Sequence, residues 1–222
     1  MTTKTQGRIA GVIYLGVVAT GTFTLAYAPG RLIVSGDPAA TAAAMAANAE
    51  LFRAANYAAL AMGAFFLALP FALSRFLSAH GAIAARLMIF LVACSIPLSL
   101  LAIAPHFELA SIVAAGGAVS LDAVKERIAA HDKWMDMASI FWGLWLAPLG
   151  WLILKSGAIP RLLGVLLIAG CAGYLANYFG PLLYDGFRDL PFRGWISIPG
   201  SIGEIGTCLW LLVMGARGSS ST

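Results

Sequence analysis

Charged residues are scarce in this chain, and their scarcity excludes most classes of protein. Asp, Glu, Lys and Arg make up 11% of the 222 residues, whereas a soluble domain carries about 25%. Because so few charges cannot cover the surface of a globule, we exclude a soluble enzyme, a disordered chain and an ordinary nucleic-acid-binding protein. The net charge of +4 does not restore a nucleic-acid role, since the sequence contains no basic cluster or basic helix.

Cysteine is also rare, and the common catalytic fingerprints are missing. The three cysteines, Cys94, Cys171 and Cys208, lie in separate apolar runs without a CxxC pair. We interpret them as small buried hydrophobic residues, because a disulfide framework or zinc site needs clustered spacing. The sequence contains no GxSxG motif, P-loop or dinucleotide-binding fingerprint. It therefore predicts no cofactor.

Long apolar runs are what the sequence has in abundance. Apolar residues make up 60% of the chain, and a membrane helix needs about 20 of them in succession. The length accommodates six such helices with short connections, which predicts an all-α polytopic membrane bundle forming a single domain over residues 1–222. The predicted spans cover residues 9–28, 51–73, 82–104, 134–154, 161–179 and 196–215.

Helix signals also occur in and around the second and third spans. Asp37 before Pro38 combines an N-cap acceptor with a proline at the first helical position. This predicts a helix over residues 39–49, which either ends before the second span or continues into it. Pro97 lies inside the third span, where the lost backbone hydrogen bond predicts a kink.

The longest predicted connection, residues 105–133, is divided by Gly116 and Gly117. Ser120 then caps a short polar helix. We expect this polar helix to be separate from the fourth span, which begins at Trp134.

Lys and Arg density predicts the orientation. Each side of the predicted bundle holds seven of these cations. On one side they lie in short, acid-free segments, namely the N-terminus, residues 74–86, residues 155–161 and the C-terminus. Because short loops rich in Lys and Arg stay in the cytoplasm, we predict that both termini are cytoplasmic.

Polar side chains lie at a similar depth in four predicted spans. Glu204 is eight residues into the sixth span, about 12 Å along the helix axis, and a charge there requires a partner. We predict Arg53 as that partner. The predicted ligand-binding site comprises Arg53, Asn56, Tyr57, Asp136, Trp142, Trp145, Tyr174, Asn177, Tyr178 and Glu204. Two interpretations remain open: a pocket that opens outward, or a buried ion pair that fixes helix register.

Two tryptophans and two histidines also have both a functional and a structural interpretation. Trp142 and Trp145 share a helical face. They either fill space by packing or by facing lipid, or they form the wall of an apolar pocket. His106 and His131 lie near acidic residues that could add zinc ligands. Their spacing matches no zinc motif, however, so we interpret them as loop and cap residues and predict no metal site.

Several short motifs resemble those of a known family. They are Arg8-Ile9-Ala10-Gly11-x-x-Tyr14, Arg31-Leu32-x-Val34-x-Gly36-Asp37, Leu51-Phe52-Arg53, Ser156-Gly157-x-x-Pro160-Arg161 and Gly203-Glu204-Ile205. Together they resemble a bacterial family of six-span integral membrane proteins catalogued as a domain of unknown function. The resemblance covers nearly the whole chain. It implies six spans and an inner-membrane location, and it matches Arg53 and Glu204 to polar positions of the family without implying an activity.

Two functional hypotheses follow. The first is a membrane module that binds or passes on a small hydrophobic or amphipathic molecule. The second is an intramembrane enzyme acting on a lipid or isoprenoid, with Glu204 or Asp136 as general acid, because a carboxylic acid in an apolar site can stay protonated. Ion-coupled transport is a weaker, third hypothesis, since the sequence lacks the broken-helix repeats of standard transporters. The expected partners are membrane lipid and a small hydrophobic ligand but no nucleic acid, and the oligomeric state is left open.

Overall fold

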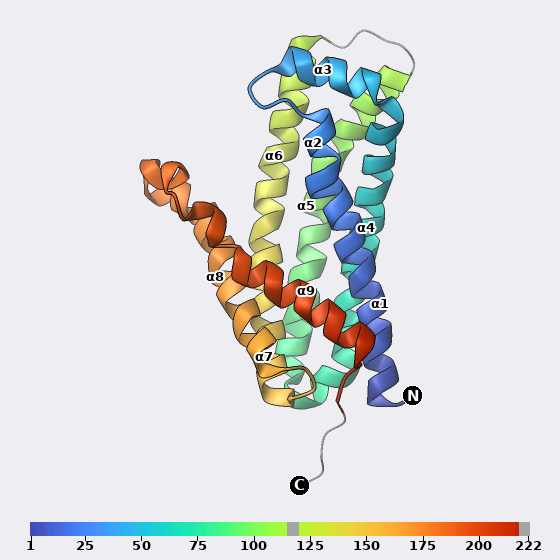
Figure 1. The fold of residues 1–222 in the computed structure, drawn as a ribbon, viewed down its shortest axis with the longest axis vertical. Helices are drawn as coiled ribbons and strands as arrows, with labels where there is room; N and C mark the ends of the chain where they lie inside the picture. The colour runs from blue at the N-terminus through green and yellow to red at the C-terminus, as the bar shows by residue number, and fades with distance from the viewer. Residues whose placement is uncertain (115–119, 218–222) are drawn as a thin grey trace. The chain divides into compact units, whose positions relative to one another are not determined.

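The computed structural model of the chain describes residues 1–114 and 120–217 and is helical (Figure 1). The long helices are α1 (Thr3–Thr22), α4 (Ala49–Leu77), α5 (Ala82–Ala114), α6 (Leu121–Leu144), α7 (Leu146–Ser156), α8 (Arg161–Leu183) and α9 (Ile198–Val213). The shorter elements are η1 (Phe23–Tyr27), α2 (Pro29–Leu32), α3 (Pro38–Ala47), η2 (Ser78–His80), η3 (Asp185–Asp189) and η4 (Arg193–Trp195).

Six helical segments among the described residues are long and apolar enough to cross a membrane. They are Thr3–Leu32, Ala49–His80, Ala82–Val113, Leu121–Ser156, Arg161–Leu183 and Arg193–Val213. Each contains or overlaps one of the predicted spans. The prediction of an all-α polytopic membrane bundle is therefore confirmed, and the chain is a multi-span membrane protein.

The helices contribute to two compact units. Unit 1 comprises Met1–Leu15, Phe65–Ser95 and Ala138–Thr222, and unit 2 comprises Gly16–Ala64 and Ile96–Met137. The helices α1, α4, α5 and α6 each pass from one unit into the other. The organisation as a single domain stays a prediction, and each unit is described by itself.

One end of unit 1 gathers segments that are far apart in the sequence. The backbone N–H of Arg217, just after α9, donates to the carbonyl oxygen of Ala158 in the α7–α8 turn at 3.0 Å. The turn after η2 approaches α7, because an ideal Cβ at Gly81 would overlap the ring of Trp151. These contacts bring together three of the four cation-rich segments that the sequence analysis placed on one side.

The fourth segment, the N-terminal helix, joins them through glycine. An ideal Cβ at Gly11 would lie 2.6 Å from the backbone nitrogen of Leu212, and one at Gly7 would overlap the backbone of Ala216. Because these positions lack side chains, α1 lies directly against the C-terminal part of α9. The buried thiol of Cys208 donates to the carbonyl oxygen of Gly11 at 3.8 Å, and this contact supports the interpretation of that cysteine as a buried residue.

Glycines also set the packing of α8 in unit 1. An ideal Cβ at Gly200 of α9 would lie 3.1 Å from the Cα of Gly170, and one at Gly150 of α7 would lie 2.5 Å from the carbonyl oxygen of Gly164. Backbone therefore meets backbone on two faces of α8. Small residues at such contacts are typical of membrane helices, where close packing replaces the hydrophobic effect.

Unit 2 contains a small apolar core built by short helices and the ends of long ones. Its buried residues are Ala28, Leu32, Met45, Phe52, Ala55, Leu109 and Val124. The predicted start of α3 is confirmed, since Asp37 Oδ1 accepts from the backbone N–H of Ala40 at 2.9 Å and Pro38 is the first helical residue. Of the two possibilities left open, the helix ends before the second span: Asn48 leaves helical geometry (φ −123°, ψ 41°) and separates α3 from α4.

The structure also corrects the boundaries around the third and fourth spans. The helix α5 does not end at residue 104 but continues through Pro105 to Ala114. The cap at Ser120 is confirmed, because its Oγ accepts from the N–H of Ala123 at 3.2 Å. The polar helix after this cap is not separate, since no helix-breaking residue precedes Trp134 and α6 continues into the fourth span. The predicted break at Gly116 and Gly117 lies outside the described residues.

Candidate functional site

The predicted site residues divide between the two units. Unit 1 holds Trp142, Trp145, Tyr174, Asn177, Tyr178 and Glu204. Unit 2 holds Arg53, Asn56, Tyr57 and Asp136. A single cluster of all ten residues stays a prediction.

Glu204 of unit 1 accepts a hydrogen bond from a tyrosine that the predicted site did not include. The hydroxyl of Tyr14 donates to Glu204 Oε1 at 3.4 Å. Tyr14 is 1% exposed, and the glycine contact between α1 and α9 brings its helix within reach of the partly buried carboxylate. A carboxylate has about four acceptor sites, so this single long bond leaves acceptor capacity for a further donor.

Aromatic rings stand beside the Tyr14–Glu204 pair. The centroids of the Tyr14 and Trp145 rings are 6.2 Å apart, and Trp145 meets Phe66 edge-on at 5.2 Å. Trp145 lies at the junction of α6 and α7 and is 1% exposed. It therefore does not face lipid, and it holds the Tyr14 ring in place.

Five buried polar atoms of unit 1 have no hydrogen-bond partner within residues 1–114 and 120–217. One belongs to His80 (Nδ1), and the other four belong to Trp142 (Nε1), Asn177 (Oδ1), Thr207 (Oγ1) and Trp210 (Nε1). Thr207 is completely buried and lies one helical turn from Glu204 on α9. Buried polar atoms without partners are uncommon, so these positions suit a bound molecule or water.

Two tyrosines of α8 differ in their surroundings. Tyr174 packs where α6 carries Gly143, whose ideal Cβ would lie 3.2 Å from the Cγ of Tyr174, and an ideal Cβ at Gly200 of α9 would lie 3.8 Å from its Cε2. Tyr178 instead packs its ring edge-on against Phe179 of the same helix, at 5.0 Å. Of these two predicted site residues, Tyr174 therefore lies beside α9, one turn before Glu204.

Arg53 of unit 2 has a partner that the sequence analysis did not consider. It forms an ion pair with Glu50, one turn earlier on α4, at 2.6 Å. The two side chains are 54% and 82% exposed, and exposed pairs of this kind contribute about 0–1 kcal/mol. The pairing of Arg53 with Glu204 stays a prediction.

The other polar residues of unit 2 join α4 to α5. Asn56 is buried, and its Nδ2 donates to the backbone oxygen of His106 at 3.2 Å. Tyr57 is 59% exposed and packs edge-on against Phe107 at 5.5 Å. These contacts explain Asn56 as a helix-joining residue.

The two histidines on the α5–α6 side of unit 2 stack on each other. The His106 and His131 rings lie 4.2 Å apart with planes 8° from parallel, and His131 Nδ1 is 3.1 Å from Asp132 Oδ1. Nearby, Arg127 donates to Glu108 at 3.0 Å. No group of three or more His, Cys, Asp or Glu residues that could hold a metal ion occurs in the described part of the chain. The stacked rings serve as packing between α5 and α6.

Residues 9–215 match the family described as domain of unknown function DUF4386. The chain belongs to this family. The matched range includes every predicted site residue, and it includes Tyr14 as well. The hydrogen-bonded pair of unit 1 therefore lies within the DUF4386 domain itself.

One curated relative aligns with part of the chain. An uncharacterized protein of Archaeoglobus fulgidus is 33% identical to this DUF4386 chain over 83 residues, which is 37% of the chain and 47% of that protein. The chain thus aligns with about half the length of this relative. No solved structure matches the chain.

Proposed function

We propose that this DUF4386 protein binds a small hydrophobic or amphipathic molecule within the membrane at the Glu204 site, defined here as Tyr14, Tyr174, Glu204 and Thr207. The partly buried Glu204 carboxylate carries the proposal, since its bond from Tyr14 is long, at 3.4 Å. A ligand hydroxyl or amine would complete the hydrogen bonding of the carboxylate.

The surroundings of the site indicate the chemical character of the rest of the ligand. Trp145 and Phe66 stand beyond Tyr14, and α8 and α9 meet through backbone and aliphatic side chains. Ligand sites commonly combine such apolar walls with a few polar groups that fix orientation. The site therefore favours a molecule with an apolar body and one polar, hydrogen-bond-donating end.

Glu204→Gln tests this proposal. The exchange preserves size and hydrogen-bonding capacity but removes the negative charge. A hydrogen bond to a charged group contributes about 1.5–3 kcal/mol and one to a neutral group about 0.5–1.5 kcal/mol, so we expect affinity to fall roughly tenfold. Molecules extracted from the purified variant and measured by mass spectrometry should be depleted relative to the wild-type protein.

Glu50→Gln is the matched control, because it removes an exposed carboxylate that also has a partner, in unit 2. This variant should retain the wild-type set of bound molecules. If Glu204→Gln instead keeps the same bound molecules while its melting temperature falls, the carboxylate is structural and the proposal is wrong.

The phenol–carboxylate contact supports a second candidate function. A positioned carboxyl group next to a tyrosine hydroxyl can transfer protons, which suits an intramembrane enzyme on a lipid or isoprenoid with Glu204 as general acid. In that case Glu204→Gln would accumulate an unprocessed precursor rather than lose its bound molecule. Asp136→Asn would do the same only if Asp136 is the acid.

We also propose that the protein lies in a bacterial inner membrane with both termini in the cytoplasm. Cation-rich segments gathered at one end of unit 1 support this orientation. With an impermeant thiol reagent on intact cells, Lys125→Cys should be labelled, whereas Thr2→Cys and Ser220→Cys should be labelled only after lysis. Labelling of positions 2 and 220 in intact cells would reverse the orientation.

A further inference from the structure

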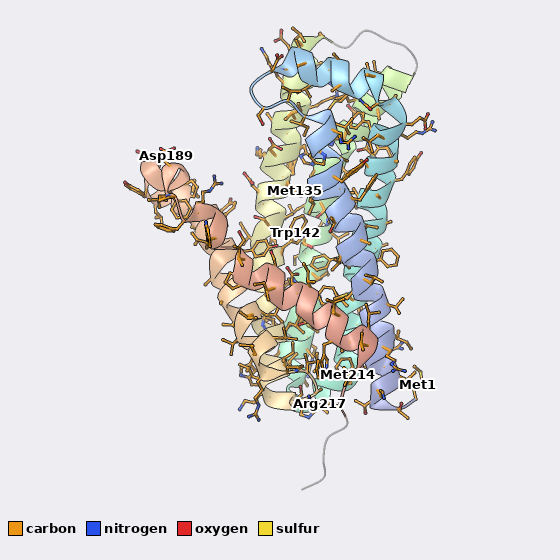
Figure 2. All side chains as sticks on the ribbon, in the orientation of Figure 1. Met1, Met135, Trp142, Asp189, Met214 and Arg217 are labelled. Atoms are coloured by element: carbon orange, nitrogen blue, oxygen red, sulfur yellow. The ribbon has the colours of Figure 1, made fainter. Side chains whose placement is uncertain are left out.

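Residues 182–198, called the connector here, join α8 to α9 and include the last two residues of α8 and the first residue of α9. The connector exposes apolar side chains along its length. Leu183 is 84% exposed and Trp195 is 72% exposed. Leu182, Tyr184, Phe192 and Ile198 are exposed as well. Figure 2 labels Asp189 at the tip of this connector, past the end of α8 in unit 1.

The backbone of the connector forms hydrogen bonds within itself. Successive bonds run from the N–H of Phe187 to the oxygen of Tyr184, from Leu190 to Phe187, and from Arg193 to Leu190, at 3.0–3.3 Å. Phe187 also folds back over Gly180 of α8. A non-helical segment near hydrocarbon must pair its polar backbone groups internally, and this connector pairs several of them in this way.

Helix lengths place the connector at the edge of the membrane. α8 has 23 residues, about 35 Å at 1.5 Å per residue, which is enough to cross a hydrocarbon core of about 30 Å. α9 has 16 residues, about 24 Å, which is too short to cross it alone. The hydrocarbon boundary therefore falls within residues 184–197 of the connector, before α9 begins.

We propose that the connector is an interfacial segment that inserts Leu183, Tyr184 and Trp195 among the lipid headgroups and upper acyl chains. Its occupant is lipid because exposed apolar side chains also lie along α8, at Leu162, Val165 and Phe179. Aromatic side chains prefer this depth. The exposed charges Asp185 and Asp189 provide the polar side that faces water.

This placement fixes the depth of the Glu204 site independently of what the site does. Glu204 is six residues after Ile198 on α9, about 9 Å along the axis. The carboxylate would then lie just below the headgroup layer, where the polar end of an amphipathic molecule can reach it.

Spin labels in liposomes test the connector. Nitroxides are attached at Leu183→Cys and Trp195→Cys in the full chain with Cys94, Cys171 and Cys208 changed to alanine. Ala172→Cys, at an exposed position in the middle of α8, is the membrane control, and Lys125→Cys is the aqueous control. We expect both connector labels to collide with oxygen but to lose most collisions with a water-soluble nickel complex relative to position 125.

Two outcomes would overturn the proposal. Nickel collisions equal to those at Lys125 would place the connector in water, and loss of collisions with both reagents would mean that protein, or a second copy of the chain, covers it. If a labelled variant has a lowered melting temperature, Leu182→Cys and Phe192→Cys replace it, since both side chains are exposed on the same connector.

Discussion

Trp145→Ala is expected to lower the free energy of unfolding by about 3–5 kcal/mol. The indole is 1% exposed and stands between Tyr14 and Phe66, at the junction of two helices. Its removal leaves a cavity that the neighbouring rings cannot fill without moving. The melting temperature in detergent measures the effect, and the Glu204 site should loosen with it because the Tyr14 ring loses its neighbour.

Trp151→Ala is the matched control for this prediction. The same side chain is removed, but Trp151 lies on α7 with 41% exposure. Its loss should change the melting temperature much less. Equal losses for the two variants would contradict the placement of Trp145 in the core of unit 1.

Gly170→Ala is expected to destabilise the protein by about 1–3 kcal/mol, the usual cost of overpacking. The new methyl group would overlap the Cα of Gly200, which is backbone and cannot rotate away. The helices α8 and α9 would have to separate, although alanine favours helix more than glycine does.

Gly63→Ala provides the opposite expectation from the same chemical change. An ideal Cβ at this helical position of α4 meets nothing within 4 Å. Alanine should therefore keep or raise the melting temperature, by up to about 1 kcal/mol of helix propensity. If Gly170→Ala is as well tolerated as Gly63→Ala, the close contact of α8 with α9 is wrong.

The fold was largely predictable because its determinants are local. Apolar runs set the spans, and the Asp37–Pro38 and Ser120 signals placed two helix starts correctly. The ends of helices were harder to predict from the sequence. The polar residues before Trp134 led to the prediction of a separate helix, but no helix-breaking residue lies there, and α6 continues into the fourth span.

The candidate site was predictable only in part, because its contacts join distant residues. Glu204 stood out as a carboxylate inside an apolar run, but its partner Tyr14 is 190 positions away. The one available signal was the Gly11-x-x-Tyr14 motif. The pair of Arg53 with Glu50 follows from their spacing of three on one helix. The sequence did not predict it, because Arg53 was assigned as the partner of Glu204 instead.

An experimental density map of the protein in lipid tests the central claim most directly. We predict non-protein density within hydrogen-bonding distance of the Glu204 carboxylate, with its apolar part extending along the aromatic side of the site, and loss of that density in Glu204→Gln. A carboxylate enclosed by protein side chains alone, in a map that resolves them, would contradict a ligand site and leave Glu204 as a structural residue.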